Sequence, residues 1–169
     1  MAVTQMWVHG NAVTVEPQDS DTIERQKHLE FGAKILVNIN KFTWMHIPVP
    51  TPAILSGVRA RLLRVFFLYA VEQQSVSPTV PQAAGGRFVE LRVFDGHREV
   101  QVFPNLNLSG SHFEHTDALN TFNLSQPHEV NVGITISANF ETSGTTTTDM
   151  PHPPPVAVTV TTAGADFET

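Results

Sequence analysis

Residues 89–102 read Val-Glu-Leu-Arg-Val-Phe-Asp-Gly-His-Arg-Glu-Val-Gln-Val, and this stretch indicates the fold class of the chain. Valine and leucine alternate with charged residues from position 89 to 93, as in a strand that buries one of its two faces. The Asp95-Gly96 pair supplies a tight turn, and valines at 100 and 102 resume the alternation. The stretch therefore predicts a β-hairpin.

The same signal recurs along the 169 residues, of which 20 are valine and 18 threonine, both β-branched and favourable in strands. We expect a hairpin around Gly10-Asn11, and mainly loop over residues 16–30. Residues 57–71 fit a helix or a strand, and we favour a strand because their surroundings are strand-like. The pattern predicts an all-β, antiparallel β-sandwich, jelly-roll-like, with long loops. Further strands are predicted near residues 31–39, 119–124 and 130–140.

The C-terminal part of the chain suggests an arm. We expect a β-sandwich domain over residues 1–142 and a Thr/Pro-rich linker over residues 143–155, which contains Met-Pro-His-Pro-Pro-Pro. Val156, Val158 and Val160 then alternate with smaller residues, so residues 156–169 are predicted to be a C-terminal strand on that arm.

The charge of the chain is divided unevenly. All 10 Lys and Arg residues lie before residue 99, while residues 99–169 carry 8 acidic and no basic residues; the net charge is −6. This division indicates compositional drift, or an acidic surface that faces a basic one within the chain or between copies. It disfavours nucleic-acid binding, which needs clustered cations.

These features favour a non-catalytic structural protein that self-assembles. The interpretation is that the C-terminal strand adds to a sheet edge of a neighbouring copy, which gives a homo-oligomeric ring or filament. The expected assembly residues are Val156, Val158, Val160, Arg59, Arg61 and Arg64.

The alternative is a lectin-like β-sandwich that binds a glycan or another ligand. An exposed tryptophan with polar neighbours is common in sugar sites, and the loops at 73–86 and 105–117 could supply the polar groups. The expected ligand-binding residues are Trp44, His112, Glu114, His115 and Asp117.

Catalytic, metal and membrane signals are weak. There is no cysteine, no Gly-x-Ser-x-Gly sequence and no phosphate-binding loop, so we expect neither an enzyme nor a cofactor. His112 and His115 lie three residues apart and on a strand would point to opposite faces, so we expect no metal site there. No apolar run approaches the ~20 residues of a membrane-spanning helix. Without a signal-peptide pattern, the expected location is the cytoplasm, with release from the cell left open.

Overall fold

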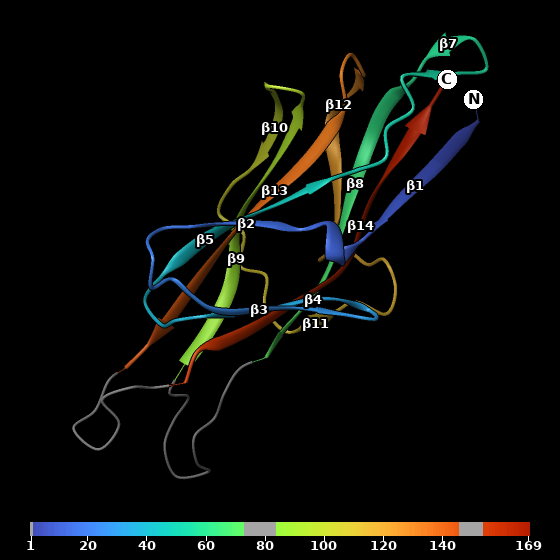
Figure 1. Ribbon diagram of the computed structural model, residues 1–169. Coiled ribbons are helices and arrows are strands. Elements are labelled where there is room, and N and C mark those ends of the chain that lie inside the picture. Colours follow the sequence, from blue (N-terminus) through green and yellow to red (C-terminus); the bar gives the residue numbers. More distant parts are fainter. Residues whose placement is uncertain (1, 73–83, 146–153) are drawn as a thin grey trace.

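The computed structural model describes residues 2–72, 84–145 and 154–169, which form two antiparallel β-sheets packed face to face (Figure 1). Sheet A has the order β11-β8-β14-β4-β3, with β1 on β14 and β12 on β8; sheet B has the order β10-β9-β13-β5-β2. A small hairpin, β6–β7, stands apart from both sheets. In sheet A the strands are β1 (Val3–His9), β3 (Ile23–Leu29), β4 (Gly32–Val37), β8 (Arg61–Glu72), β11 (Ser111–His112), β12 (Thr121–Glu129) and β14 (Val156–Glu168). In sheet B they are β2 (Thr14–Pro17), β5 (Phe42–Pro48), β9 (Ala84–Asp95), β10 (Arg98–Phe103) and β13 (Ile134–Gly144); the hairpin is β6 (Ile54–Leu55) and β7 (Val58–Arg59).

The strand order is that of a jelly roll. Eight strands, taken along the chain as β4, β5, β8, β9, β10, β12, β13 and β14, divide between the sheets as β4-β14-β8-β12 and β5-β13-β9-β10. This arrangement, in which the last strand lies between the first and the third, is two interleaved Greek keys. The predicted all-β, jelly-roll-like sandwich is confirmed.

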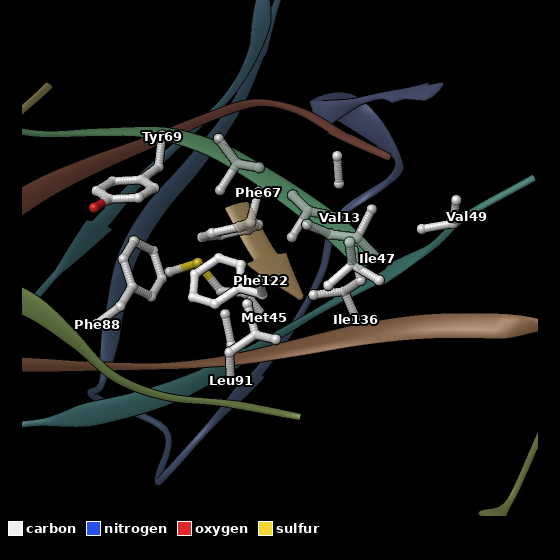
Figure 2. Packing of buried hydrophobic residues seen from close by; sticks show 14 of the residues in the cluster. Val13, Met45, Ile47, Val49, Phe67, Tyr69, Phe88, Leu91, Phe122 and Ile136 are labelled. Atoms are coloured by element: carbon white, nitrogen blue, oxygen red, sulfur yellow. The ribbon is translucent and has the colours of Figure 1, made fainter. Parts of the chain in front are cut away.

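One hydrophobic core fills the space between the sheets. Phe67 and Tyr69 from β8 point toward Phe88 and Leu91 from β9 and toward Met45 from β5 (Figure 2). The Phe67 and Phe88 rings meet edge to face, with centroids 4.9 Å apart, which is a favoured aromatic geometry. The alternation read from the sequence is therefore the alternation between this core and the two outer faces.

The C-terminal strand belongs to the sandwich, which corrects the expected arm. Val156, Val158 and Val160 are fully buried, and β14 pairs with β8 on one side and with β4 and β1 on the other. The alternation of valine with small residues fits a central strand as well as an added one, so the sequence could not distinguish the two. Of the expected linker, residues 143–144 close β13, and residues 146–153 lie outside the described part of the chain.

The expected hairpin at Gly10-Asn11 is wrong, because β1 and β2 lie in different sheets. Between them, a 3-10 turn over Gly10–Ala12 carries the chain from sheet A to sheet B. A Cβ atom on Gly10 would lie 2.0 Å from the carbonyl oxygen of Val160, so only glycine allows the chain to cross β14 this closely.

Three further predictions concern residues 57–71, the Asp95-Gly96 turn and residues 16–30. Of residues 57–71, favoured as a strand, residues 61–71 lie in β8, while Val58–Arg59 form β7 of the small hairpin. The Asp95-Gly96 turn joins β9 to β10, as predicted. The expected loop over residues 16–30 is wrong in its second half, which is the edge strand β3. Its five central residues are exposed, so this strand lacks the alternation of buried and exposed side chains that predicts a strand.

Candidate functional site

The outer face of sheet B carries an aromatic and charged cluster. In β5, Met45 and Ile47 are fully buried in the core, so Trp44 and His46 point to the opposite, solvent side. Both are half-buried there.

Strand register brings polar residues from three other strands beside them. Ser137 on β13 lies between His46 on one side and Arg92 of β9 on the other. One row further along, Asn139 lies between Trp44 and Glu90, and Glu16 of β2 is the partner of Trp44 on its far side. We call Glu16, Trp44, His46, Glu90, Arg92, Ser137 and Asn139 the sheet B cluster.

Arg92 is the cation at the centre of this cluster. Its guanidinium carbon lies 5.1 Å from the centroid of the Trp44 ring, within cation–π range. Its Nε donates to Glu90, and Nη1 lies 3.4 Å from Oε2 of Glu99 on β10. Glu16, bonded to His46, adds a third carboxylate to this face, so the face offers both donors and acceptors under an acidic balance.

His46 links two oxygen atoms across three strands. Its Nδ1 lies 2.8 Å from Oγ of Ser137, and its Nε2 lies 3.0 Å from Oε2 of Glu16. Ser137 is 3% exposed, whereas the Glu16 side chain is 70% exposed. These two contacts fix the orientation of the His46 ring between the buried Ser137 and the exposed Glu16.

Two hollows lie along this face of β9. The first, of about 190 Å³, is lined by Glu16, Trp44, His46, Arg92, Phe94 and Ser137. The second, of about 520 Å³, is lined by Arg87, Val89, Glu90, Pro104, Asn105, Leu106, Asn107 and Glu141. Arg92 lines the first hollow and Glu90 lines the second. Because these two side chains are hydrogen-bonded to each other, the two hollows are adjacent along β9.

Asn139 leaves one polar atom without a partner within the described residues. Its Oδ1 is buried and accepts no hydrogen bond from residues 2–72, 84–145 or 154–169. A buried acceptor of this kind costs free energy unless a donor satisfies it. Asn139 lies in the row of Trp44 and Glu90 and lines neither of the two hollows.

The expected ligand-binding loop does not join Trp44. His112 lies in β11 of sheet A, where its ring packs against Tyr69 with centroids 5.5 Å apart. Its Nδ1 is 3.0 Å from Asp117, which also accepts from the N–H groups of Leu119 and Asn120. The His112 hydrogen bond lowers the pKa of Asp117; burial opposes it, and the N–H donors lower the pKa further. These contacts stabilise a loop.

The other two residues of that expected loop are exposed. Glu114 and His115 lie on the loop surface, and His115 contributes its carbonyl oxygen to the Asn120 side chain. The expected glycan site is therefore divided: Trp44 lies on sheet B, and residues 112–117 lie at the edge of sheet A.

The expected assembly arginines pair with acidic residues of their own chain. Arg64 lies 2.6 Å from Asp166, Arg61 lies 3.4 Å from Glu168 on the same neighbouring strand, and Arg59 lies 3.4 Å from Glu129. The basic first half of the chain thus meets the acidic second half within one molecule, which is one of the two arrangements that the charge division indicated. That these arginines also contact a neighbouring copy stays a prediction; the side chains of Arg59, Arg61 and Arg64 are 53%, 44% and 43% exposed.

Most of the sheet B cluster was missed by sequence reasoning. Trp44 was predicted as a ligand-binding residue, but Glu16, His46, Arg92 and Ser137 were not, and they lie in four separate segments. Their alternation with core residues was a usable signal that each faces outward. Which strands are neighbours follows from the jelly-roll order, and no single segment contains that information.

Within residues 2–72, 84–145 and 154–169, no group of three or more His, Asp or Glu side chains could hold a metal ion. No helix in this part of the chain is long and apolar enough to cross a membrane.

The protein is thus a jelly-roll β-sandwich with an aromatic and charged cluster on the outer face of one sheet. The chain belongs to a family of unknown function, DUF6623, whose model matches residues 1–152.

Comparison with other proteins adds little about function. No curated protein matches the chain. Among solved structures, it is similar to the crystal structure of exo-beta-1,3-galactanase from Phanerochaete chrysosporium with galactose, at a TM-score of 0.38 and 9% sequence identity. That match covers 96% of this chain and 29% of the galactanase chain, and it is too distant to support an argument about function.

Proposed function

We propose that this protein is a non-catalytic, saccharide-binding β-sandwich whose ligand lies on the outer face of sheet B. The observation that supports this most is the half-buried Trp44 beside a hollow with donors and acceptors from four strands. A sugar ring presents apolar C–H groups to an aromatic ring and hydroxyl groups to polar neighbours, and this cluster offers both kinds of partner.

The charge balance favours a neutral ligand. Glu16, Glu90 and Glu99 outnumber Arg92, and the guanidinium already contacts two of these carboxylates. An anionic ligand would meet net repulsion, while hydroxyl groups can donate to carboxylates and accept from Arg92.

The size of the two hollows favours more than one sugar unit. The first, about 190 Å³, is smaller than the roughly 300–1,000 Å³ of pockets that take drug-sized ligands. The second is larger, at about 520 Å³, and adjoins the first at the Glu90–Arg92 pair. A short oligosaccharide that runs along β9 would use both.

A hydrolase is the sharper alternative, because Ser137, His46 and Glu16 are in hydrogen-bond reach in the order of a catalytic triad. Ser137, however, is 3% exposed and lies in a strand paired on both sides. Its neighbouring main-chain N–H groups serve the sheet, which leaves Arg92 as the oxyanion donor, and Arg92 is held by two carboxylates. These features favour binding over catalysis. Ester hydrolysis by the intact chain that is lost in Ser137→Ala would contradict this part of the proposal.

The test compares the two tryptophans of the chain on a glycan array and by calorimetry. Trp44→Ala is expected to weaken saccharide binding at least tenfold, which corresponds to about 1.4 kcal/mol. Trp7→Ala is the matched control, because Trp7 is half-exposed on sheet A, stacked on Phe66 at 5.0 Å. Equal binding by both variants, or no saccharide bound by the intact chain, would contradict the proposal.

A further inference from the structure

The edge strands of both sheets differ in how they are protected from pairing with another chain. An exposed strand edge presents unpaired N–H and C=O groups, and natural proteins block it with charges, proline, bulges or short strands. In sheet A, β3 carries Glu24, Arg25 and Lys27, while β12 contains Pro127 and a register shift. In sheet B, β2 has four residues and ends in proline, and β10 begins with Arg98-Glu99 and has a register shift. Each of these edges therefore has at least one such device.

The edge strand β1 has none of these devices. Its seven residues, Val-Thr-Gln-Met-Trp-Val-His, include no Lys, Arg, Asp, Glu, Pro or Gly. It pairs with β14 in continuous register from Val3 to His9, without a bulge. Among the strands that the structure describes, β14 is its sole partner, so the other edge of β1 is open there.

We propose that β1 pairs antiparallel with β1 of a second copy of this chain, so that the two A sheets join across a twofold axis. An antiparallel pair of identical strands satisfies the open N–H and C=O groups on both molecules. This association is additional to the ligand site, which lies on the other sheet.

Charge favours a second copy as the partner. Because β1 carries no formal charge, two copies can approach without like charges facing each other on the joined strands. The nearest acidic residues on β14 are already compensated, since Asp166 pairs with Arg64 and Glu168 with Arg61. A charged peptide segment would find no complementary side chain along β1.

Pairing with a second β1 would also cover apolar side chains of β1 that are exposed or half-buried. Val3 and Trp7 are 53% and 39% exposed on the outer face of sheet A. On the inner face, Met6 and Val8 are half-buried at the rim of the core. A second β1 would place an apolar neighbour beside each set, because side chains opposite one another on paired strands interact.

The test is the molar mass in solution of the intact chain, measured by light scattering and sedimentation up to hundreds of micromolar. One joined strand buries less than the roughly 1,200–2,000 Å² of stable complexes, so dissociation in the micromolar range is expected. The mass should rise with concentration from 18.6 kDa toward twice that value. A mass that stays at the monomer value at the highest concentration would overturn the proposal.

Two matched variants locate the interface. Gln5→Lys adds a charge to the exposed side of β1 and should weaken dimerisation at least tenfold, while Gln26→Lys makes the same change on the already charged edge β3 and should leave it unchanged. Amide hydrogen exchange provides a readout without substitution, because exchange in residues 3–9 should slow as concentration rises. A dimer that survives Gln5→Lys, or that protects other residues, would overturn the assignment to β1.

Discussion

Arg64 on β8 donates from Nε to Oδ2 of Asp166 on β14 at 2.6 Å, joining residues 102 positions apart in the chain. The carboxylate is buried, while the Arg64 side chain is 43% exposed. This pair lies on the outer face of sheet A, next to the stacked rings of Trp7 and Phe66. It links the basic first half of the chain to its acidic second half.

Removing the cation of this pair should destabilise the protein. Arg64→Met leaves the buried Asp166 carboxylate without its partner, and we expect a loss of about 2 kcal/mol in the free energy of unfolding, between the values for exposed and for fully buried pairs. The double variant Arg64→Met/Asp166→Leu should lose less than the sum of the two single changes. Urea unfolding of the four proteins measures this coupling, and simple additivity would contradict a direct interaction.

The position of β14 at the centre of sheet A predicts the result of truncation. A chain that ends at Pro155 lacks a strand paired on both sides, and it should show no cooperative thermal transition by circular dichroism. As a milder change, Val158→Ala in the core should cost about 2 kcal/mol. Val132→Ala, at a residue that is 71% exposed, should change stability by less than about 0.5 kcal/mol. A truncated chain that folds would show that residues 156–169 are dispensable after all.

The hydrogen bonds to the Asp95 carboxylate predict that the protein loses stability in acid. Burial raises the pKa of this carboxyl, but the N–H groups of Asn131, Val132 and Gly133 and the His128 ring outweigh burial and hold the pKa well below its usual range. A lowered pKa in the folded state stabilises the protein above the unfolded value of about 3.9, and this contribution is lost as pH falls below it.

Substitution of Asp95 should remove that dependence. Asp95→Ala leaves several buried N–H donors without an acceptor, so we expect a loss of about 2–4 kcal/mol at pH 7 and a smaller difference from the intact chain at pH 3. Guanidinium unfolding at both values measures this, with the exposed Glu114→Gln as control. An Asp95→Ala penalty that is the same at pH 7 and pH 3 would contradict the assignment.

Local alternation was enough to predict the fold class but not the sheet to which each strand belongs. The β9–β10 hairpin follows from valines around Asp95-Gly96, because both strands and their turn are contiguous. The position of β14 in sheet A depends on its pairing with β8 and β4, which are far away in sequence. Its alternating valines are compatible with an edge strand and with a central strand, so they do not distinguish the two. β3 was missed because an exposed edge strand buries no regular set of apolar side chains.

The candidate site illustrates the same limit. Trp44 could be proposed from its residue type alone, because an aromatic ring is a common part of sugar sites. His46, Ser137 and Arg92 become neighbours only through the β5-β13-β9 order, which arises from two Greek keys. The His112–Asp117 loop resembled a ligand site because its residue types are shared by binding loops and by loops that are stabilised through their own hydrogen bonds.

The most direct test of the proposed function uses the fluorescence of Trp44. The chain has two tryptophans, so Trp7→Phe leaves Trp44 as the sole reporter on the outer face of sheet B. Titration with neutral oligosaccharides should change its emission saturably, and acidic saccharides should bind more weakly. If the folded Trp7→Phe protein gives no saturable change with any saccharide at millimolar concentration, sheet B does not bind sugar through Trp44.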